Sequence, residues 1–236
     1  MFNTPVSAAC LLCATPINSR SGFCQPCTLN LPYLYCPCQR CAIELGQSAP
    51  AHTHCEHCLL EPPFFDYCLA LGRYEYPLPA LISRFKFNAK LSAGRAMSIA
   101  LLHEIKSHLH NRTPDALLPV PLHAKRIRSR GFNQSTQIAT WLAKPLKIPV
   151  IDNYCHRTRA TESQRGLTAM ARANNLKGAF QLRQGIEQWQ HIAIVDDVVT
   201  TKSTVNAIAQ LLKGQGVLRV GVICLARVSE TIRTDT

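Results

Sequence analysis

The chain has 236 residues, of which 47% are hydrophobic and 17% are charged. This composition is typical of a folded protein and argues against a disordered chain, and no apolar run approaches the roughly 20 residues that a membrane-spanning helix needs. The net charge is +12, but residues 1–65 carry two arginines against three glutamates, so the rest of the chain carries about +13. Such a surplus favours polyanions, either nucleic acid or a ligand with several phosphates, over a basic surface with no partner. The N-terminal residues lack the pattern of a secretory signal, so we expect a cytoplasmic protein.

Cysteine dominates the first quarter of the chain. Eight residues form four C-x-x-C pairs: Cys10 and Cys13, Cys24 and Cys27, Cys38 and Cys41, and Cys55 and Cys58. In a cytosolic chain such pairs indicate metal more than disulfides, and two C-x-x-C turns supply the four thiolates of one tetrahedral zinc ion. Pairing neighbouring turns therefore predicts two structural zinc sites in a double zinc ribbon over residues 1–65. Alternative ligands near them are Cys36, His52, His54 and His57, whereas Cys68, Cys155 and Cys224 are expected in the core.

Residues 66–112 are expected to connect the ribbons to a larger domain. Two prolines in 61–67 indicate a linker, and 70–76 is interpreted as a short strand. Apolar residues at helical intervals predict helices over 78–87 and 92–110 that pack on the larger domain. Their basic residues are interpreted as a solvated face: Arg84, Lys86, Lys90 and Arg95.

The larger domain is expected over residues 113–236 and opens with a strand at 116–122. A basic cluster follows directly, consisting of Lys125, Arg126, Arg128 and Arg130, and a helix begins after Gly131-Phe132-Asn133-Gln134. Four cations in six residues beside a strand end predict an anion site, and an exposed basic helix is the competing interpretation.

The segment 157–175 holds four arginines, one glutamate and few apolar residues. This composition predicts a mobile loop that faces an anion, with disorder of no functional role as the alternative.

Residues 192–212, IAIVDDVVTTKSTVNAIAQLL, combine a strand, a turn and a helix start. An apolar run is expected to form a strand that Asp196 and Asp197 end, and helical periodicity resumes after a hydroxyl-rich turn. The N-terminus of a helix attracts a phosphate, and paired carboxylates at a strand end suit ribose hydroxyls or a hydrated Mg²⁺. The simpler interpretation, an N-cap beside two solvated aspartates, explains less of the pattern.

A further buried strand is expected at 218–225. Alternating strands and helices from residue 116 onward predict an α/β fold whose parallel sheet binds ligands at its carboxyl edge.

The stretch from Val195 to Thr204 resembles the phosphoribosyl pyrophosphate (PRPP) motif of type I phosphoribosyltransferases. That motif is a strand followed by DD, two or three residues, and TTG with a small residue and T. The resemblance implies that Asp196 and Asp197 hold the ribose. It also implies that the loop Thr200, Thr201, Lys202, Ser203 and Thr204 holds the 5′-phosphate, with Lys202 in place of the usual glycine.

A narrower resemblance covers nearly the whole chain. Leu118-Pro-Val-Pro-Leu122 followed by Arg128-Ser-Arg-Gly-Phe-Asn-Gln134 resembles the signature of the ComF/ComFC competence proteins, in which zinc ribbons precede a phosphoribosyltransferase domain. It implies that the loop with Pro121 and Leu122 faces the pyrophosphate, near Arg130, Asn133 and Gln134. It also implies that 157–175 is a hood over the site, matched at Arg157, Thr161, Gln164, Arg172 and Asn175.

Together with these resemblances, the sequence predicts a type I phosphoribosyltransferase fold, a parallel sheet flanked by helices, with an N-terminal double zinc ribbon. The resemblance to competence proteins implies a role in DNA uptake. The expected protein binds PRPP or a related compound with Mg²⁺, and phosphoribosyl transfer is its candidate reaction. A second hypothesis is a single-stranded DNA binder in which this site only docks or regulates, although few aromatic residues lie among the cations in the sequence. A third is an assembly factor whose ribbons recruit a DNA helicase.

The cysteine pattern predicts the zinc content of the protein. Elemental analysis of the purified protein should find about two zinc ions per chain, since each pair of C-x-x-C turns completes one four-thiolate site. A zinc content of zero would contradict the ribbon assignment.

Overall fold

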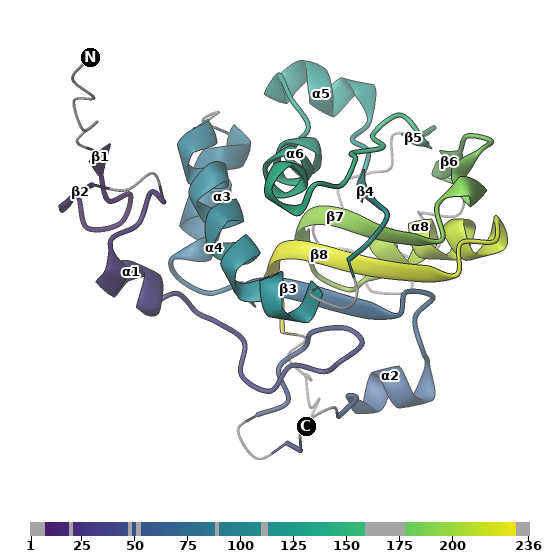
Figure 1. Cartoon of the computed structure of the whole chain (residues 1–236), viewed down its shortest axis with the longest axis horizontal. Helices are drawn as coiled ribbons and strands as arrows, with labels where there is room; N and C mark the ends of the chain where they lie inside the picture. The colour runs from purple at the N-terminus through teal and green to yellow at the C-terminus, as the bar shows by residue number, and fades with distance from the viewer. Residues whose placement is uncertain are drawn as a thin grey trace, which may run out of the picture.

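A four-stranded sheet forms the centre of the computed structural model, which describes residues 8–18, 21–46, 49–50, 53–87, 90–109, 113–158 and 178–229. The strand order is β3-β8-β7-β4, and all three pairings are parallel (Figure 1). The strands are β3 (Tyr67–Arg73), β4 (Ala116–Pro119), β7 (His191–Val199) and β8 (Arg219–Arg227). The predicted α/β fold with a parallel sheet is confirmed.

Each face of the sheet is covered by its own set of helices (Figure 1). Successive residues of a strand point to opposite faces, so Ile192 and Ile194 of β7 join one core cluster while Ala193 and Val195 join the other. The apolar stripe of α8 (Ser203–Gly214) packs on the first face. The second face is covered by α3 (Leu78–Phe87), α4 (Leu91–Leu109) and α6 (Gln134–Leu146). Both faces of the central strands are thereby removed from water, as a parallel sheet requires.

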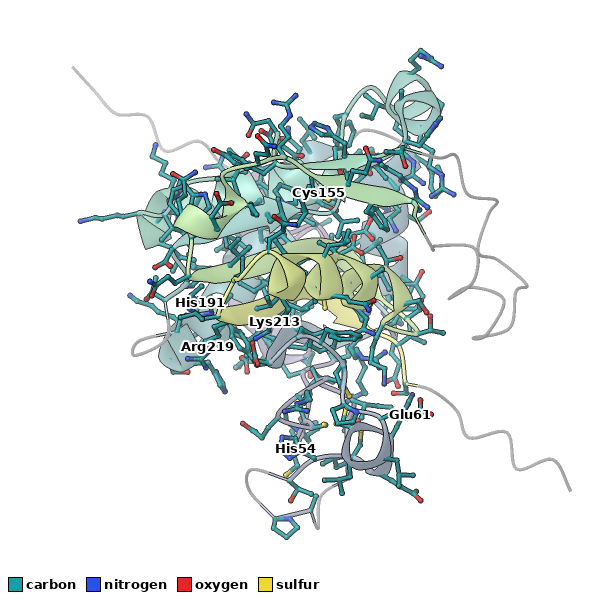
Figure 2. All side chains as sticks on the ribbon, turned by 90° about the vertical axis from the view of Figure 1, so that its right-hand side faces the viewer. His54, Glu61, Cys155, His191, Lys213 and Arg219 are labelled. Carbon is teal, nitrogen blue, oxygen red and sulfur yellow. The ribbon has the colours of Figure 1, made fainter. Side chains whose placement is uncertain are left out.

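The two cysteine-rich modules lie on different faces of this sheet. The first contains β1 (Ala8–Ala9), β2 (Pro16–Ile17) and α1 (Gln25–Leu29), and its Phe23 and Leu31 join the cluster of α3 and α4. The second contains α2 (Glu56–Leu60), and its Cys38, Cys41 and Cys58 join the cluster of α8. Figure 1 shows the first module beside α3 and α4 and the second below β3, and Figure 2 labels His54 and Glu61 in the second.

Several predicted boundaries differ from the structure. The prediction that Asp196 and Asp197 end their strand is wrong, because β7 runs to Val199 and Asp196 still pairs with Cys224 of β8. The short strand expected at 70–76 is β3, which begins at Tyr67 and is an edge strand of the main sheet. The strand expected at 116–122 ends at Pro119.

Smaller elements lie outside the main sheet. The basic cluster forms α5 (Ala124–Arg130), and β5 (Cys155–Arg157) pairs with β6 (Phe180–Leu182) in an antiparallel hairpin that is followed by η1 (Ile186–Gln188). Cys68, Cys155 and Cys224 are buried, as expected. Among the described segments, no helix combines the length and the hydropathy needed to cross a bilayer.

Candidate functional site

A cleft of about 850 Å³ opens at the carboxyl edge of the sheet. Its walls come from the ends of β4 and β7, the loop before α8, the start of α6, and parts of α3 and α5. His191 and Arg219 mark the amino ends of β7 and β8 in Figure 2, so the cleft lies at the opposite edge. Parallel sheets commonly bind ligands at this edge because their strand ends and helix N-termini meet there.

Asp196 lies on the wall of the cleft and is half-buried. Its Oδ1 accepts hydrogen bonds from Ser135 Oγ at 3.1 Å and from the backbone N–H of Asp197 at 2.8 Å. Burial and the adjacent carboxylate of Asp197 raise the pKa of Asp196 from 3.8 to about 7, outweighing those hydrogen bonds and the charge of Lys86, which lower it. Asp196 can therefore gain or lose a proton near neutral pH.

Asp197 is 8% exposed and forms an ion pair with Lys86, whose Nζ lies 2.8 Å from its Oδ2. The interpretation of Lys86 as part of a solvated face is wrong: α3 brings this side chain to the cleft, where it balances one of two adjacent acids. Helical periodicity placed Lys86 on the polar side of its helix, and only the packing of α3 beside β7 shows which polar group it meets.

The loop between β7 and α8 has the geometry of an anion site. Lys202 adopts the left-handed conformation, with φ of 66° and ψ of −12°, and is the N-cap of α8 without a side-chain cap. A non-glycine residue in this conformation carries a conformational cost. The Lys202 side chain is also buried, with 8% exposure. Thr201 Oγ1 and Ser203 Oγ lie 3.0 Å apart beside the uncapped N–H groups of the helix. Both hydroxyls and helix N–H groups therefore face the same part of the cleft.

The start of α6 forms the adjoining wall. Asn133 caps the helix by accepting from Ser135 N–H at 3.1 Å, and its amide donates to the carbonyl of Val120 at 3.0 Å. Gln134 is 1% exposed and accepts from Arg130 through Oε1 at 3.1 Å, while its buried Nε2 has no hydrogen-bond partner among the described residues. Because a buried amide donor is costly to leave unpaired, Nε2 is a candidate donor to a ligand in the cleft.

Cations gather on the side of α5 and β5. Arg126, Arg130 and Arg157 all line the cleft. Burial first, and repulsion from Arg126 second, lower the pKa of Arg157, and the charge of Asp196 opposes them. The arginines and the acids therefore share one electrostatic environment.

The structure brings most of the predicted ligand-binding residues together. Those that line the cleft are Leu122, Arg130, Gln134, Arg157, Asp196, Asp197, Thr200, Thr201, Lys202, Ser203 and Thr204. Pro121 and Asn133 do not line it, although Asn133 holds the end of β4 to α6. Gln164 lies outside the described residues, as do Thr161, Arg172 and Asn175 of the expected hood. Sequence reasoning missed Tyr74, Lys86 and Phe87, whose segments carry no motif, and Ser135, which directly follows the signature at 128–134.

Two further groups are suited to metal. The structure assembles Cys10, Cys13, Cys24 and Cys27 into one group and Cys38, Cys41, Cys55 and Cys58 into another, and within each group the sulfur atoms lie within 4.8 Å of one another. The Sγ atoms of Cys13 and Cys24 lie 3.6 Å apart, and those of Cys41 and Cys55 also lie 3.6 Å apart. Zinc–sulfur bonds of about 2.3 Å in a tetrahedron imply about 3.8 Å, so both groups fit zinc. Neither group includes Cys36, His54 or His57, and His52 lies outside the described residues.

No protein-family model matches the chain. Among solved structures, a purine phosphoribosyltransferase from Pyrococcus horikoshii is similar over 56% of this chain and 69% of its own, with 17% sequence identity and a TM-score of 0.32.

Sequence relatives cover far more of the chain. Competence protein F of Haemophilus influenzae is 35% identical over 92% of this chain and 96% of its own length. DNA utilization protein YhgH of Escherichia coli K12 is 37% identical over 94% of this chain and 98% of its own length. Competence protein ComFC of Bacillus subtilis is 25% identical over 88% of this chain and 89% of its own length. This similarity covers nearly the whole chain, so the chain belongs to the ComF/ComFC family of competence proteins.

Proposed function

We propose that the cleft binds PRPP or a related phosphoribosyl compound together with Mg²⁺, and that the protein acts in the handling of DNA during competence. The observation that carries the proposal is the convergence of two adjacent acids, an uncapped helix N-terminus and several arginines on one cleft. A ligand with a sugar and phosphates at both ends matches this distribution of charge. The relatives named for competence and for DNA utilization support the cellular role.

Each part of the proposed ligand can be matched to a group of residues that line the cleft. The hydroxyl loop and the first N–H groups of α8 suit the 5′-phosphate, and Asp196 and Asp197 suit the ribose hydroxyls. Arg126, Arg130 and Arg157 suit the pyrophosphate. Carboxylate oxygens are the hard ligands that Mg²⁺ prefers, so these two acids also fit this ion, which would neutralise phosphate charge.

The same residues suit phosphoribosyl transfer. In this reaction a nucleophile bonds to the anomeric carbon, and the bond to pyrophosphate breaks with its electron pair leaving on pyrophosphate. The arginines would stabilise that departing charge.

Ligand binding can be tested by thermal unfolding with and without Mg²⁺ and PRPP. The ligand should raise the melting temperature of the wild type, since a ligand that binds only the folded state stabilises it. The double variant Asp196→Asn with Asp197→Asn should lose the shift.

A matched control removes the same amount of negative charge elsewhere. Asp152 and Glu187 are exposed and do not line the cleft. The variant Asp152→Asn with Glu187→Gln should therefore keep the shift. If the wild type melts at the same temperature with and without ligand, the proposed binding is wrong.

The raised pKa of Asp196 predicts a pH dependence that needs no ligand. Between pH 3.8 and about 7 the folded state keeps a proton on Asp196 that the unfolded state has lost. The folded state binds more protons in this range, so the free energy of unfolding should fall as pH rises from about 4 to 7 and then level off. Denaturant titrations of the wild type and Asp196→Asn should diverge across this range, because the amide does not titrate. Parallel curves would show that Asp196 has an ordinary pKa.

One observation favours a second function, the binding of single-stranded DNA. Aromatic residues are few among the cations in the sequence, but folding brings Phe87 and Tyr74 to the cleft, where they are 61% and 40% exposed. The guanidinium of Arg130 lies 5.2 Å from the centre of the Phe87 ring. Proteins that bind single strands combine aromatic stacking surfaces with cations in this way.

This function can be tested by fluorescence anisotropy with a labelled oligothymidine at two salt concentrations. Phe87→Ala should weaken binding by roughly 5- to 150-fold, since stacking contributes about 1–3 kcal/mol per base. Phe87→Trp should retain binding. Leu218, also exposed at 70% but located before the amino end of β8, provides the control Leu218→Ala. Equal affinities for Phe87→Ala and Leu218→Ala would rule out stacking on this ring.

A further inference from the structure

Arg227, the last residue of β8, joins two segments that are far apart in the sequence. It is 1% exposed and is one of the largest fully buried side chains among the described residues. Its Nε donates to the carbonyl oxygen of Cys41 at 2.9 Å, and its Nη1 donates to the carbonyl oxygens of Val199 at 3.1 Å and Thr200 at 2.5 Å. One guanidinium therefore connects the second cysteine group to the loop that precedes α8.

These hydrogen bonds determine which way the loop presents its N–H groups. The C=O and N–H of a trans peptide point in opposite directions. Holding the carbonyls of Val199 and Thr200 toward Arg227 therefore turns the N–H groups of Thr200 and Thr201 away from it, on the side where both residues line the cleft. The left-handed conformation of Lys202 continues this turn, and successive N–H groups in such turns form anion sites.

The other end of the connection is held by the cysteine group itself. Cys38 and Cys41 are 1% and 0% exposed and belong to the same core cluster as Val199. Four thiolates on one metal would hold the backbone at Cys41, including the carbonyl that Arg227 contacts. Loss of the metal would release this carbonyl and weaken its hydrogen bond with the buried guanidinium. A buried charged donor with a weakened hydrogen bond destabilises the folded state.

The first cysteine group provides a natural contrast. Its Cys13 is exposed, and its Cys27 packs against the cluster on the other face of the sheet. A Cβ at Gly22 would lie 2.5 Å from the side chain of Ala96 in α4, so this module rests on α4. In the described part of the chain, no hydrogen bond joins this module to the loop at 199–204.

We propose that Arg227 is a positioning residue through which metal at Cys38, Cys41, Cys55 and Cys58 maintains the ligand-binding conformation of residues 199–204. Metal at the first group has no such effect. Metal at the second group would thereby regulate the proposed phosphoribosyl site. The affinity measurement described below rests on that proposed function. The positioning role of Arg227 is independent of any ligand.

The test uses two matched cysteine variants of the full chain. Cys13→Ser alters the first group and Cys55→Ser the second, at positions that are exposed and half-buried. Each should reduce zinc from about two ions to about one per chain. Hydrogen–deuterium exchange of the amides at 199–204, without ligand, should accelerate in Cys55→Ser and be unchanged in Cys13→Ser. Equal exchange in the two variants would overturn the proposal.

Arg227→Lys keeps the positive charge but lacks the fork of donors that reaches both segments. It should retain both zinc ions and still accelerate exchange at 199–204, so it decides the question even if Cys55→Ser does not fold. Unchanged exchange in Arg227→Lys would refute the role of this residue. Adding Cys55→Ser to Arg227→Lys should cause little further acceleration, because both changes break one connection.

Calorimetry with Mg²⁺ and PRPP adds the functional measurement. Affinity should fall about tenfold or more in Cys55→Ser and in Arg227→Lys, as expected for loss of charged hydrogen bonds, and stay within about twofold in Cys13→Ser. If the wild type binds no PRPP, the proposed function fails while the exchange experiment still decides the coupling. If affinity is unchanged in all variants, the coupling to the ligand site is wrong.

Discussion

The site depends on the parallel pairing of β7 with β8 on one side and β4 on the other. Because all strands run in the same direction, the carboxyl ends of β4 and β7 open on one edge, and the helices that follow them, α6 and α8, begin there. The hydrogen bond from Ser135 to Asp196 joins these two strand-to-helix units across the cleft. A shift in register of one residue would exchange the faces to which Asp196 and Asp197 point, so strand pairing itself positions the chemistry.

The cleft balances charges that would be unfavourable alone. Two adjacent carboxylates repel, and the structure reduces this repulsion in two ways: Lys86 forms an ion pair with Asp197, and the pKa of Asp196 rises to about 7. Asp196 can keep a proton until a cation or a polar ligand favours its ionised form. A divalent cation at the proposed site would compete with Lys86 for Asp197.

The two cysteine modules are equivalent in sequence pattern but not in their surroundings. The first rests on α4, whereas the second is part of the core beneath α8 and contacts the loop at 199–204 through Arg227. Metal binding supplies much of the folding free energy of such short segments. Loss of the second metal should therefore disturb the main domain more than loss of the first, because buried apolar contacts connect it to the sheet.

The sequence by itself determined the local features: the spacing of the cysteines, the parallel α/β fold, and the acids and hydroxyls before α8. These follow from short-range rules of strand period, helix period and metal-ligand spacing, which need only neighbouring residues. It did not predict that β7 continues through Asp196, because pairing with β8 maintains the strand where polarity suggested its end. Only the tertiary structure brought Lys86, Ser135, Phe87 and Arg227 to the site and separated the two modules onto opposite faces. Lys86, Phe87 and Arg227 lie in segments without a motif, and Ser135 directly follows one. The partners of all four are decided by how helices and strands distant in the sequence pack together.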